Sequence, residues 1–182
     1  MQLQSSNNKF IITGAPGTGK SSLLEALKQD FNCLEEVARP VIRQQQQQGG
    51  DALPWVNLPQ FADEVYQKTI AAYKTNPTFE VTDRSLLDLI AYLKAAGESV
   101  PKHIAEFPYQ SMFAKTVFLT PCWESIFQRD PQRQQSFTEA QALERMILSV
   151  YKSYGFEVIE LAKASVECRR QAVVTEINKT KN

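Results

Sequence analysis

The sequence predicts a three-layer α/β/α fold, in which helices cover both faces of a five-stranded parallel sheet. Two features of the 182-residue chain lead to this expectation. Short apolar segments alternate with longer segments of helical periodicity, a pattern typical of parallel sheets. A glycine-rich segment also joins the first apolar segment to the first helix. Because the length suits a single core, residues 1–182 are expected to form one domain.

Short apolar segments are the expected strands, at residues 10–13, 33–37, 78–82, 116–119 and 156–161. Helices are expected where apolar residues recur with helical spacing, at residues 20–31, 61–73, 85–96, 136–155 and 165–177. Ser136 and Glu139 have the spacing of a capping box, which marks the start of one of these helices. The glutamine run at 44–48 suits the end of a further helix, because two glycines follow it.

Composition limits the class of protein. The formal net charge is zero, so no overall field attracts nucleic acid or anionic lipid, and neither is expected as a partner. No apolar run reaches the roughly 18 residues of a membrane-spanning helix, and the N-terminal residues lack the apolar stretch of a signal peptide. The wide spacing of Cys33, Cys122 and Cys168 favours reduced thiols over a disulfide framework. A cytoplasmic protein is expected, and a homodimer is left open.

The stretch GAPGTGKSS, residues 14–22, follows the first expected strand. It satisfies G-x-x-x-x-G-K-[ST], the pattern of a phosphate-binding loop (P-loop), and it lies between a strand and a helix as that motif requires. Glycines let main-chain N–H groups point at one anion, and the following helix adds its positive end. Lys20 is expected to reach the β- and γ-phosphates of ATP, and Ser21 to ligate Mg²⁺. The expected nucleotide-binding residues are Gly14, Ala15, Pro16, Gly17, Thr18, Gly19, Lys20, Ser21 and Ser22.

Asp83 ends the third expected strand, at the edge of the sheet where the P-loop lies. Ligands bind in the crevice at the carboxyl ends of parallel strands, so this carboxylate is a second candidate ligand of Mg²⁺. Arg84 follows at once and could bind an anionic group. The alternative is that Asp83 caps the helix that begins near Ser85.

Glu35 and Glu36 close the second expected strand. One of them could face the same crevice, as a base for a substrate hydroxyl or as a metal partner through water. The alternative is a solvated carboxylate. Arg39 lies one helical turn after Glu36 and could face the same way.

The polar segment FQRDPQRQQSF contains Arg129 and Arg133. A mobile flap with these arginines could close over a transferred phosphoryl group, and an exposed basic loop is the alternative. His103, the one histidine, is expected at the surface or at a helix end. Three aromatic residues could line a substrate pocket, although core packing is favoured for them: Trp55, Phe61 and Tyr66.

These segments resemble a known family. The stretches FIITGAPGTGKSSLLEAL, EEVARPVI, VTDRSLLDLIAYL, VFLTP and QRDPQRQQSF are similar to those of a group of P-loop ATPases and kinases. That group is related to the nucleotide-kinase domain of NadR-type proteins and carries an AAA-type label. The resemblance runs from about Lys9 to the end of the sequence. Its more specific part is the combination of E-x-x-R after the second strand with D-R-x-x-x-D after the third.

The resemblance implies a P-loop NTPase fold of the nucleotide-kinase type, with strand order 2-3-1-4-5 and a lid segment. It implies that Glu35 or Glu36 acts as a base toward the acceptor hydroxyl, and Glu36 is favoured because the E-x-x-R spacing includes it. It also implies that Arg84 lies near the donor and the acceptor, as in the similar D/E-R-S element of deoxynucleoside kinases. Arg129 and Arg133 match the arginines of family lids. The chain lacks a clear hhhhDE motif and a sensor or arginine-finger region, which argues against the mechanical function of ring-forming AAA proteins.

Together, these features predict a Mg²⁺-dependent ATP phosphotransferase, a kinase for a small acceptor such as a nucleoside, a nucleotide or a related metabolite. The expected catalytic residues are Lys20, Glu36, Asp83, Arg84, Arg129 and Arg133, and the expected metal ligands are Ser21 and Asp83. The alternative is a nucleotide-binding switch whose slow ATP hydrolysis gates a partner protein. A GTPase is disfavoured, because no N-K-x-D base-recognition motif is present.

Overall fold

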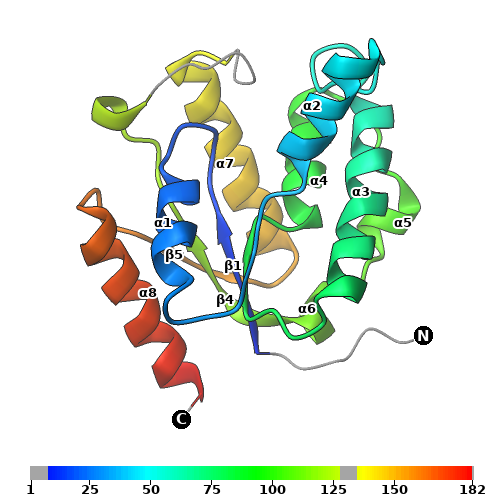
Figure 1. Ribbon diagram of the computed structural model, residues 1–182. Coiled ribbons are helices and arrows are strands. Elements are labelled where there is room, and N and C mark those ends of the chain that lie inside the picture. Colours follow the sequence, from blue (N-terminus) through cyan, green and yellow to red (C-terminus); the bar gives the residue numbers. More distant parts are fainter. Residues whose placement is uncertain (1–7, 128–134, 182) are drawn as a thin grey trace.

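A computed structural model describes residues 8–127 and 135–181, which form a parallel sheet covered by helices on both faces (Figure 1). The strands are β1 (Lys9–Thr13), β2 (Cys33–Leu34), β3 (Val81–Asp83), β4 (Phe113–Leu119) and β5 (Glu157–Glu160). Their order in the five-stranded sheet is β2-β3-β1-β4-β5. β1 is central and pairs in parallel with β3 and β4. The expected three-layer fold and strand order are confirmed.

The helices are α1 (Lys20–Leu27), α2 (Ala38–Gln48), α3 (Leu58–Thr75), α4 (Leu86–Ala95), α5 (Lys102–Ala105), α6 (Tyr109–Met112), α7 (Phe137–Ser153) and α8 (Val166–Lys181). A short 3-10 helix, η1 (Glu124–Ile126), follows β4. α1 and α8 pack side by side on one face of the sheet, whereas α2, α3, α4 and α7 lie on the other (Figure 1).

Both faces are covered because successive apolar residues of a strand point to opposite sides. On β1, Phe10 and Ile12 belong to the core cluster under α1 and α8, whereas Ile11 belongs to the cluster under the other helices. β4 alternates in the same way, with Phe118 on the first side and Val117 on the second. Helices thus pack against both faces of the central strands, and this packing fixes the positions from which the following loops start.

Several expected elements are shorter than the sequence predicts, and α1 and β2 are two of them. α1 ends at Leu27, because the amides of Asp30 and Phe31 both bond to the carbonyl of Leu27 and turn the chain. β2 covers only Cys33–Leu34, since it is an edge strand that pairs with β3 alone. Residues 35–37 therefore lie beyond the strand, at the same edge of the sheet as the P-loop.

Two local predictions about helix ends are confirmed. Ser136 and Glu139 form a reciprocal capping box at the start of α7. The glutamine run ends α2, and Gly49 stops the helix with a left-handed φ of 65°.

His103 is exposed on α5, with its Nε2 3.1 Å from Asp63, as expected for a surface histidine.

All three cysteines are free thiols. None of the helices in the described ranges is both long enough and apolar enough to span a bilayer.

Candidate active site

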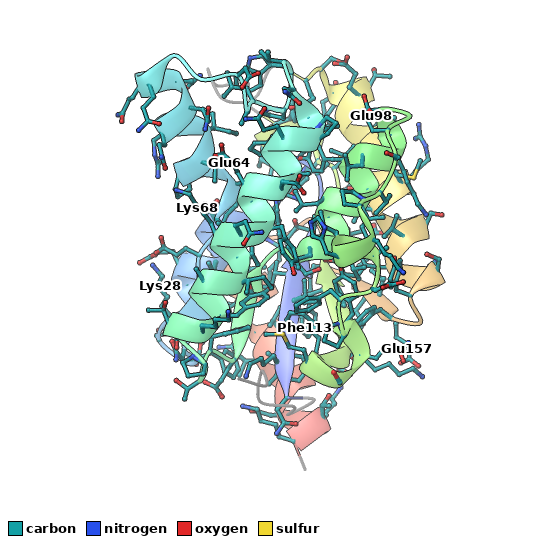
Figure 2. All side chains as sticks on the ribbon, turned by 90° about the vertical axis from the view of Figure 1, so that its right-hand side faces the viewer. Lys28, Glu64, Lys68, Glu98, Phe113 and Glu157 are labelled. Atoms are coloured by element: carbon teal, nitrogen blue, oxygen red, sulfur yellow. The ribbon has the colours of Figure 1, made fainter. Side chains whose placement is uncertain are left out.

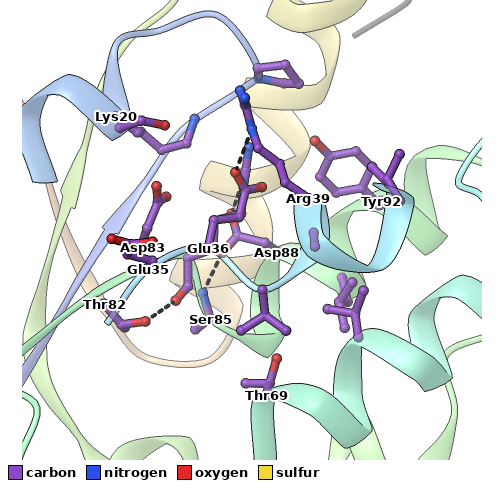
Figure 3. Close-up of a pocket in the computed structure, with 18 of the residues that line it drawn as sticks. Lys20, Glu35, Glu36, Arg39, Thr69, Thr82, Asp83, Ser85, Asp88 and Tyr92 are labelled. Atoms are coloured by element: carbon purple, nitrogen blue, oxygen red, sulfur yellow. Dashed lines mark hydrogen bonds and ion pairs between the residues drawn. The ribbon is translucent and has the colours of Figure 1, made fainter. Parts of the chain in front are cut away.

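The segments that follow β1, β2 and β3 meet at one edge of the sheet and line a pocket of about 270 Å³ (Figure 3). They meet there because parallel strands have their carboxyl ends on the same side. The pocket brings together Lys20, Glu36, Asp83 and Arg84, four residues that the sequence assigns to the site. Its volume lies near the lower end of small-molecule sites, which begin at about 300 Å³.

The P-loop curls tightly against the end of β4. Gly14 has a φ of 144°, and a Cβ there would lie 2.4 Å from the carbonyl oxygen of Thr120. The hydroxyl of Thr120 lies 2.7 Å from that of Thr18, and it also donates to the carbonyl of Thr13. Position 14 therefore requires glycine, both for its backbone conformation and for this close approach.

Lys20 is buried inside the P-loop, where its Nζ donates to the carbonyl of Ala15 at 2.6 Å and to Thr18 Oγ1 at 3.3 Å. Burial, and then the positive charge of Arg84, lower the pKa of Lys20 to about 8, although Asp83 and other carboxylates act in the opposite direction. The loop thus holds a poorly solvated cation, and this arrangement favours an anionic ligand.

Asp83 is buried at the end of β3, and its Oδ1 has no hydrogen-bond partner among the described residues. Burial, and then the negative charge of Glu36, raise the pKa of Asp83 to about 6. The residue that caps α4 is Ser85, whose hydroxyl accepts the amide of Leu87, so the alternative of Asp83 as the helix cap is wrong. A buried carboxylate oxygen without a partner is unfavourable unless a cation or a donor joins it.

Arg84 makes several of the hydrogen bonds and ion pairs of the site. Its Nε donates to Glu36 at 3.0 Å, and its Nη1 donates to Asp88 and to the carbonyl of Gly14, each at 2.9 Å. Its φ of 72° lies in the left-handed region, which residues other than glycine seldom adopt. Strained backbone of this kind is concentrated at functional sites, where surrounding contacts hold it in place.

Of the two glutamates after β2, Glu36 is the one that reaches the site arginines. It lies 3.0 Å from Arg84 and 3.4 Å from Arg39. Burial alone would raise the pKa of Glu36, but Arg84 and the neighbouring cations outweigh it, so the pKa is lowered and the carboxylate is ionised at neutral pH. Glu35 is exposed and pairs with Lys28 at 2.6 Å, although its segment still lines the pocket.

Asp88, on α4, is a site residue that the sequence motifs left without a role. It is 2% exposed and accepts hydrogen bonds at both oxygens. Oδ1 accepts from Thr13 at 2.7 Å and from Arg84 at 2.9 Å. Oδ2 accepts from the amide of Ser85 at 3.0 Å and from the hydroxyl of Tyr151 at 2.6 Å. The D-R-x-x-x-D motif contains both Arg84 and Asp88, but Arg84 precedes the N-cap of α4, so helical spacing does not predict their contact.

Arg169, on α8, contacts the P-loop and was also missed. Its Nη1 donates to the carbonyl of Thr18 at 3.3 Å and would lie 3.1 Å from a Cβ at Gly19. The side chain is 5% exposed, and its Nε has no partner among the described residues. No local pattern marks this arginine, because its contact joins distant parts of the chain.

Beyond the charged residues, the pocket continues between α2, α3 and α4 (Figure 3). Its wall there is largely apolar or aromatic, with Ile42, Pro54, Phe61, Val65, Thr69, Tyr73, Leu89 and Tyr92. The three aromatic residues considered in the sequence analysis have different environments. Phe61 lines the pocket and also belongs to the core, Tyr66 packs edge-on against His103, and Trp55 is 39% exposed.

Polar side-chain contacts join α2 and α3, two of the helices that form this wall. Figure 2 shows Glu64 and Lys68 on the side of α3 that faces α2. The side-chain amide of Gln45, on α2, donates to Glu64 at 2.7 Å.

Arg129 and Arg133, the arginines of the expected flap, lie outside the described residues.

A P-loop after the central strand, a carboxylate–arginine pocket beside it and the strand order define the class of the protein as a P-loop NTPase of the nucleotide-kinase fold. A family model described as an AAA domain matches residues 9–169. The chain therefore belongs to this AAA domain family.

Solved structures with the same fold are nucleoside and nucleotide kinases. Deoxyadenosine kinase from M. mycoides, with the products dCMP and a flexible dCDP bound, has a TM-score of 0.66 at 15% identity, over 94% of this chain and 99% of that one. The same enzyme with dATP bound gives a TM-score of 0.65 at 16% identity, over 93% and 99%. Thymidylate kinase from Candida albicans gives 0.58 at 9% identity, over 96% and 92%. No curated protein sequence matches the chain significantly.

Proposed function

We propose that the protein is a Mg²⁺-dependent ATP phosphotransferase that phosphorylates a hydroxyl group of a small acceptor. The observation that carries this proposal is one pocket that runs from the P-loop, past Glu36, to the wall formed by α3. A switch that only hydrolyses ATP needs only the part of this pocket beside the P-loop. The part beyond Glu36, toward α3, suits a second substrate.

The residues of the loop fit a bound polyphosphate. Residues 14–22 contain the close-packed Gly14, then Gly19 at the N-cap of α1, and then the buried cation of Lys20. In this proposal the main-chain amides and Lys20 bind the β- and γ-phosphates, and Arg84 stabilises the negative charge that develops during transfer. Arg129 and Arg133 keep the charge-stabilising role that the resemblance implies.

A magnesium ion fits the oxygen atoms that are available. The described residues contain no group of three or more histidine, cysteine or acidic side chains that could hold a metal alone. The unpartnered Oδ1 of Asp83 and the exposed hydroxyl of Ser21 are oxygen donors of the kind that Mg²⁺ takes, with phosphate and water as its other ligands. When bound, Mg²⁺ would neutralise phosphate charge.

In the transfer step, the acceptor hydroxyl oxygen forms a bond to the γ-phosphorus, and the bond from that phosphorus to the β–γ bridging oxygen breaks, so ADP leaves. Glu36 accepts the hydrogen bond of the hydroxyl and then its proton, which passes on to water. The lowered pKa of Glu36 makes it a weak base, so its main contribution is to orient the hydroxyl. Such a role suffices, because phosphoryl transfer depends chiefly on positioning and charge stabilisation.

The test measures ADP release with ATP, Mg²⁺ and a panel of nucleosides, nucleotides and sugars. The proposal predicts that ADP release rises strongly with at least one acceptor and that an equimolar phosphorylated product appears. A slow release that is the same across the whole panel would instead support the nucleotide-binding switch.

A further inference from the structure

The charges of the pocket are gathered at one end. Among the described residues that line it, the basic side chains are Lys20, Arg39 and Arg84, and the acidic ones are Glu35, Glu36, Asp83 and Asp88. They belong to α1 beside the P-loop, to the residues from the end of β2 to the first turn of α2, and to the residues from the end of β3 to the first turn of α4. This charged end is where the phosphates and the transferred group belong.

The opposite end of the pocket is uncharged. Figure 3 shows Thr69, on α3, well apart from Lys20, with its hydroxyl turned toward the pocket. Tyr73 follows Thr69 by one helical turn and lines the same pocket. Both side chains are buried, at 6% and 1% exposure. The far end therefore has two neutral hydroxyl groups set in an apolar wall.

The hydroxyl of Tyr73 has no hydrogen-bond partner among the described residues. The ring of Tyr73 makes packing contacts in the core, because it stacks on Phe79 and packs edge-on against Phe113. A phenylalanine would make the same ring contacts without an unsatisfied polar atom. Burial, and then the charge of Asp88, raise the pKa of Tyr73, so the group stays a neutral hydroxyl that can donate or accept. An unpartnered hydroxyl in a pocket wall indicates a partner on a ligand.

Resting on the proposed function, we infer that the acceptor is of the nucleoside type and not a nucleotide. Its uncharged ring occupies the far end of the pocket, between the apolar wall and the hydroxyls of Thr69 and Tyr73. Its own hydroxyl group then lies at the charged end, beside Glu36.

A second phosphate, on the acceptor, does not fit the charges of the pocket. A phosphate monoester carries between about one and a half and two negative charges at neutral pH. The two arginines of the pocket already pair with Glu36, and Arg84 also pairs with Asp88. Three basic side chains face four acidic ones among the described lining residues, so an added dianion would lack a counter-charge there.

The first experiment compares matched acceptors. ADP release is measured with ATP, Mg²⁺ and either adenosine, deoxyadenosine, cytidine or thymidine, or the 5′-monophosphate of each. The inference predicts release with one or more nucleosides and at least about tenfold lower kcat/KM with the matching monophosphates. Release with monophosphates but not with nucleosides would overturn the inference and leave the kinase proposal intact. No acceptor-dependent release with either set would remove both.

The second experiment separates recognition from stability. Tyr73→Phe is expected to raise the KM for the nucleoside about 3- to 10-fold, the contribution of one neutral hydrogen bond, and to leave the KM for ATP unchanged. The melting temperature of the free protein should stay the same or rise, because the variant loses a buried hydroxyl that has no partner among the described residues. Tyr109→Phe is the matched control, since its buried hydroxyl donates to the carbonyl of Ile104 at 2.7 Å outside the pocket. It is expected to lower the melting temperature and leave the KM for the nucleoside unchanged. An unchanged KM in Tyr73→Phe would overturn the role assigned to this hydroxyl.

Discussion

The hydroxyl of Tyr151 donates a hydrogen bond of 2.6 Å to Oδ2 of Asp88, a residue 63 positions earlier in the chain. The bond joins α7 to α4 in the core, and the other oxygen of the same carboxylate holds Arg84. Arg84, the proposed catalytic arginine with a left-handed backbone, is therefore supported by a tyrosine that does not line the pocket. In the proposed function Tyr151 is a positioning residue, because it contacts the site through Asp88.

Tyr151→Phe is expected to lower both stability and turnover. The change leaves a buried carboxylate short of one donor, which costs about 1–3 kcal/mol. Urea unfolding measures that loss, and ADP release should show a lower kcat with little change in the KM for ATP. Tyr154→Phe is the control, because its hydroxyl makes a longer bond of 3.2 Å to the carbonyl of Ala105, away from the site. Equal kcat in the two variants would contradict the positioning role.

Asp83→Asn is expected to stabilise the free protein at neutral pH. The pKa of Asp83 is about 6 in the folded protein against an ordinary 3.8, so the folded state binds this proton more tightly. Ionised Asp83 therefore lowers stability above pH 6, and this cost fades as the pH falls toward 4. At about 1.4 kcal/mol per pKa unit, the gain should be roughly 1–3 kcal/mol at pH 7.

Denaturation of the Asp83→Asn protein at pH 7 and at pH 4 tests both parts of this expectation. The gain should be clear at pH 7 and small at pH 4, while ATP turnover falls because a candidate metal ligand is lost. Asp63→Asn, at an exposed position, should change stability by less than about 0.5 kcal/mol at either pH. A variant that is less stable than the parent at pH 7 would show that the ionised carboxylate is favourable.

Lys20→Met is expected to abolish ATP turnover and leave the fold intact. The buried ammonium group is poorly solvated, so its removal costs little stability, but the loop loses the cation that faces the phosphates. We expect a fall in turnover of about 100-fold or more. ADP release and thermal unfolding measure the two effects, with Lys74→Met at an exposed position of α3 as the control. An unchanged rate would remove Lys20 from its assigned role.

Gly14→Ala is expected to be far more harmful than alanine at another glycine with positive φ. A Cβ at position 14 would lie 2.4 Å from the carbonyl oxygen of Thr120, whereas at Gly97 it would meet nothing within 4 Å. Gly97→Ala therefore suffers only the backbone strain of roughly 1–2 kcal/mol. Gly14→Ala adds a clash with β4 and should also lose ATP affinity. Similar unfolding midpoints and similar ATP affinities for the two variants would contradict this account.

Local patterns predict the fold and several local structures of the site well. The P-loop, the Ser136 capping box and the end of α2 depend on residues close together in sequence, and all three have the expected structure. The E-x-x-R and D-R-x-x-x-D motifs likewise place Glu36 and Arg84, whose contact spans 48 positions, at one edge of the sheet. The flap arginines stay a prediction.

Other parts of the site could not be found in this way, because they depend on contacts between distant segments. Asp88 reads as an ordinary residue of a helix start until Thr13 and Tyr151 are seen to share its carboxylate. The hydroxyl of Tyr73 is notable only because nothing in the described structure binds it. Strand length at a sheet edge is similarly a tertiary property, which explains why β2 is shorter than its sequence suggests.

The bond from Arg169 to the carbonyl of Thr18 joins residues 151 positions apart, and Thr120 reaches Thr13 across 107 positions. Closing a long loop costs conformational entropy before its contacts add any stability. Contacts between residues this far apart in sequence are therefore expected to form late during folding. We therefore expect the P-loop to gain its native shape only with the global folding transition. ATP affinity then reports on completed refolding, and bound ATP should slow unfolding without accelerating folding.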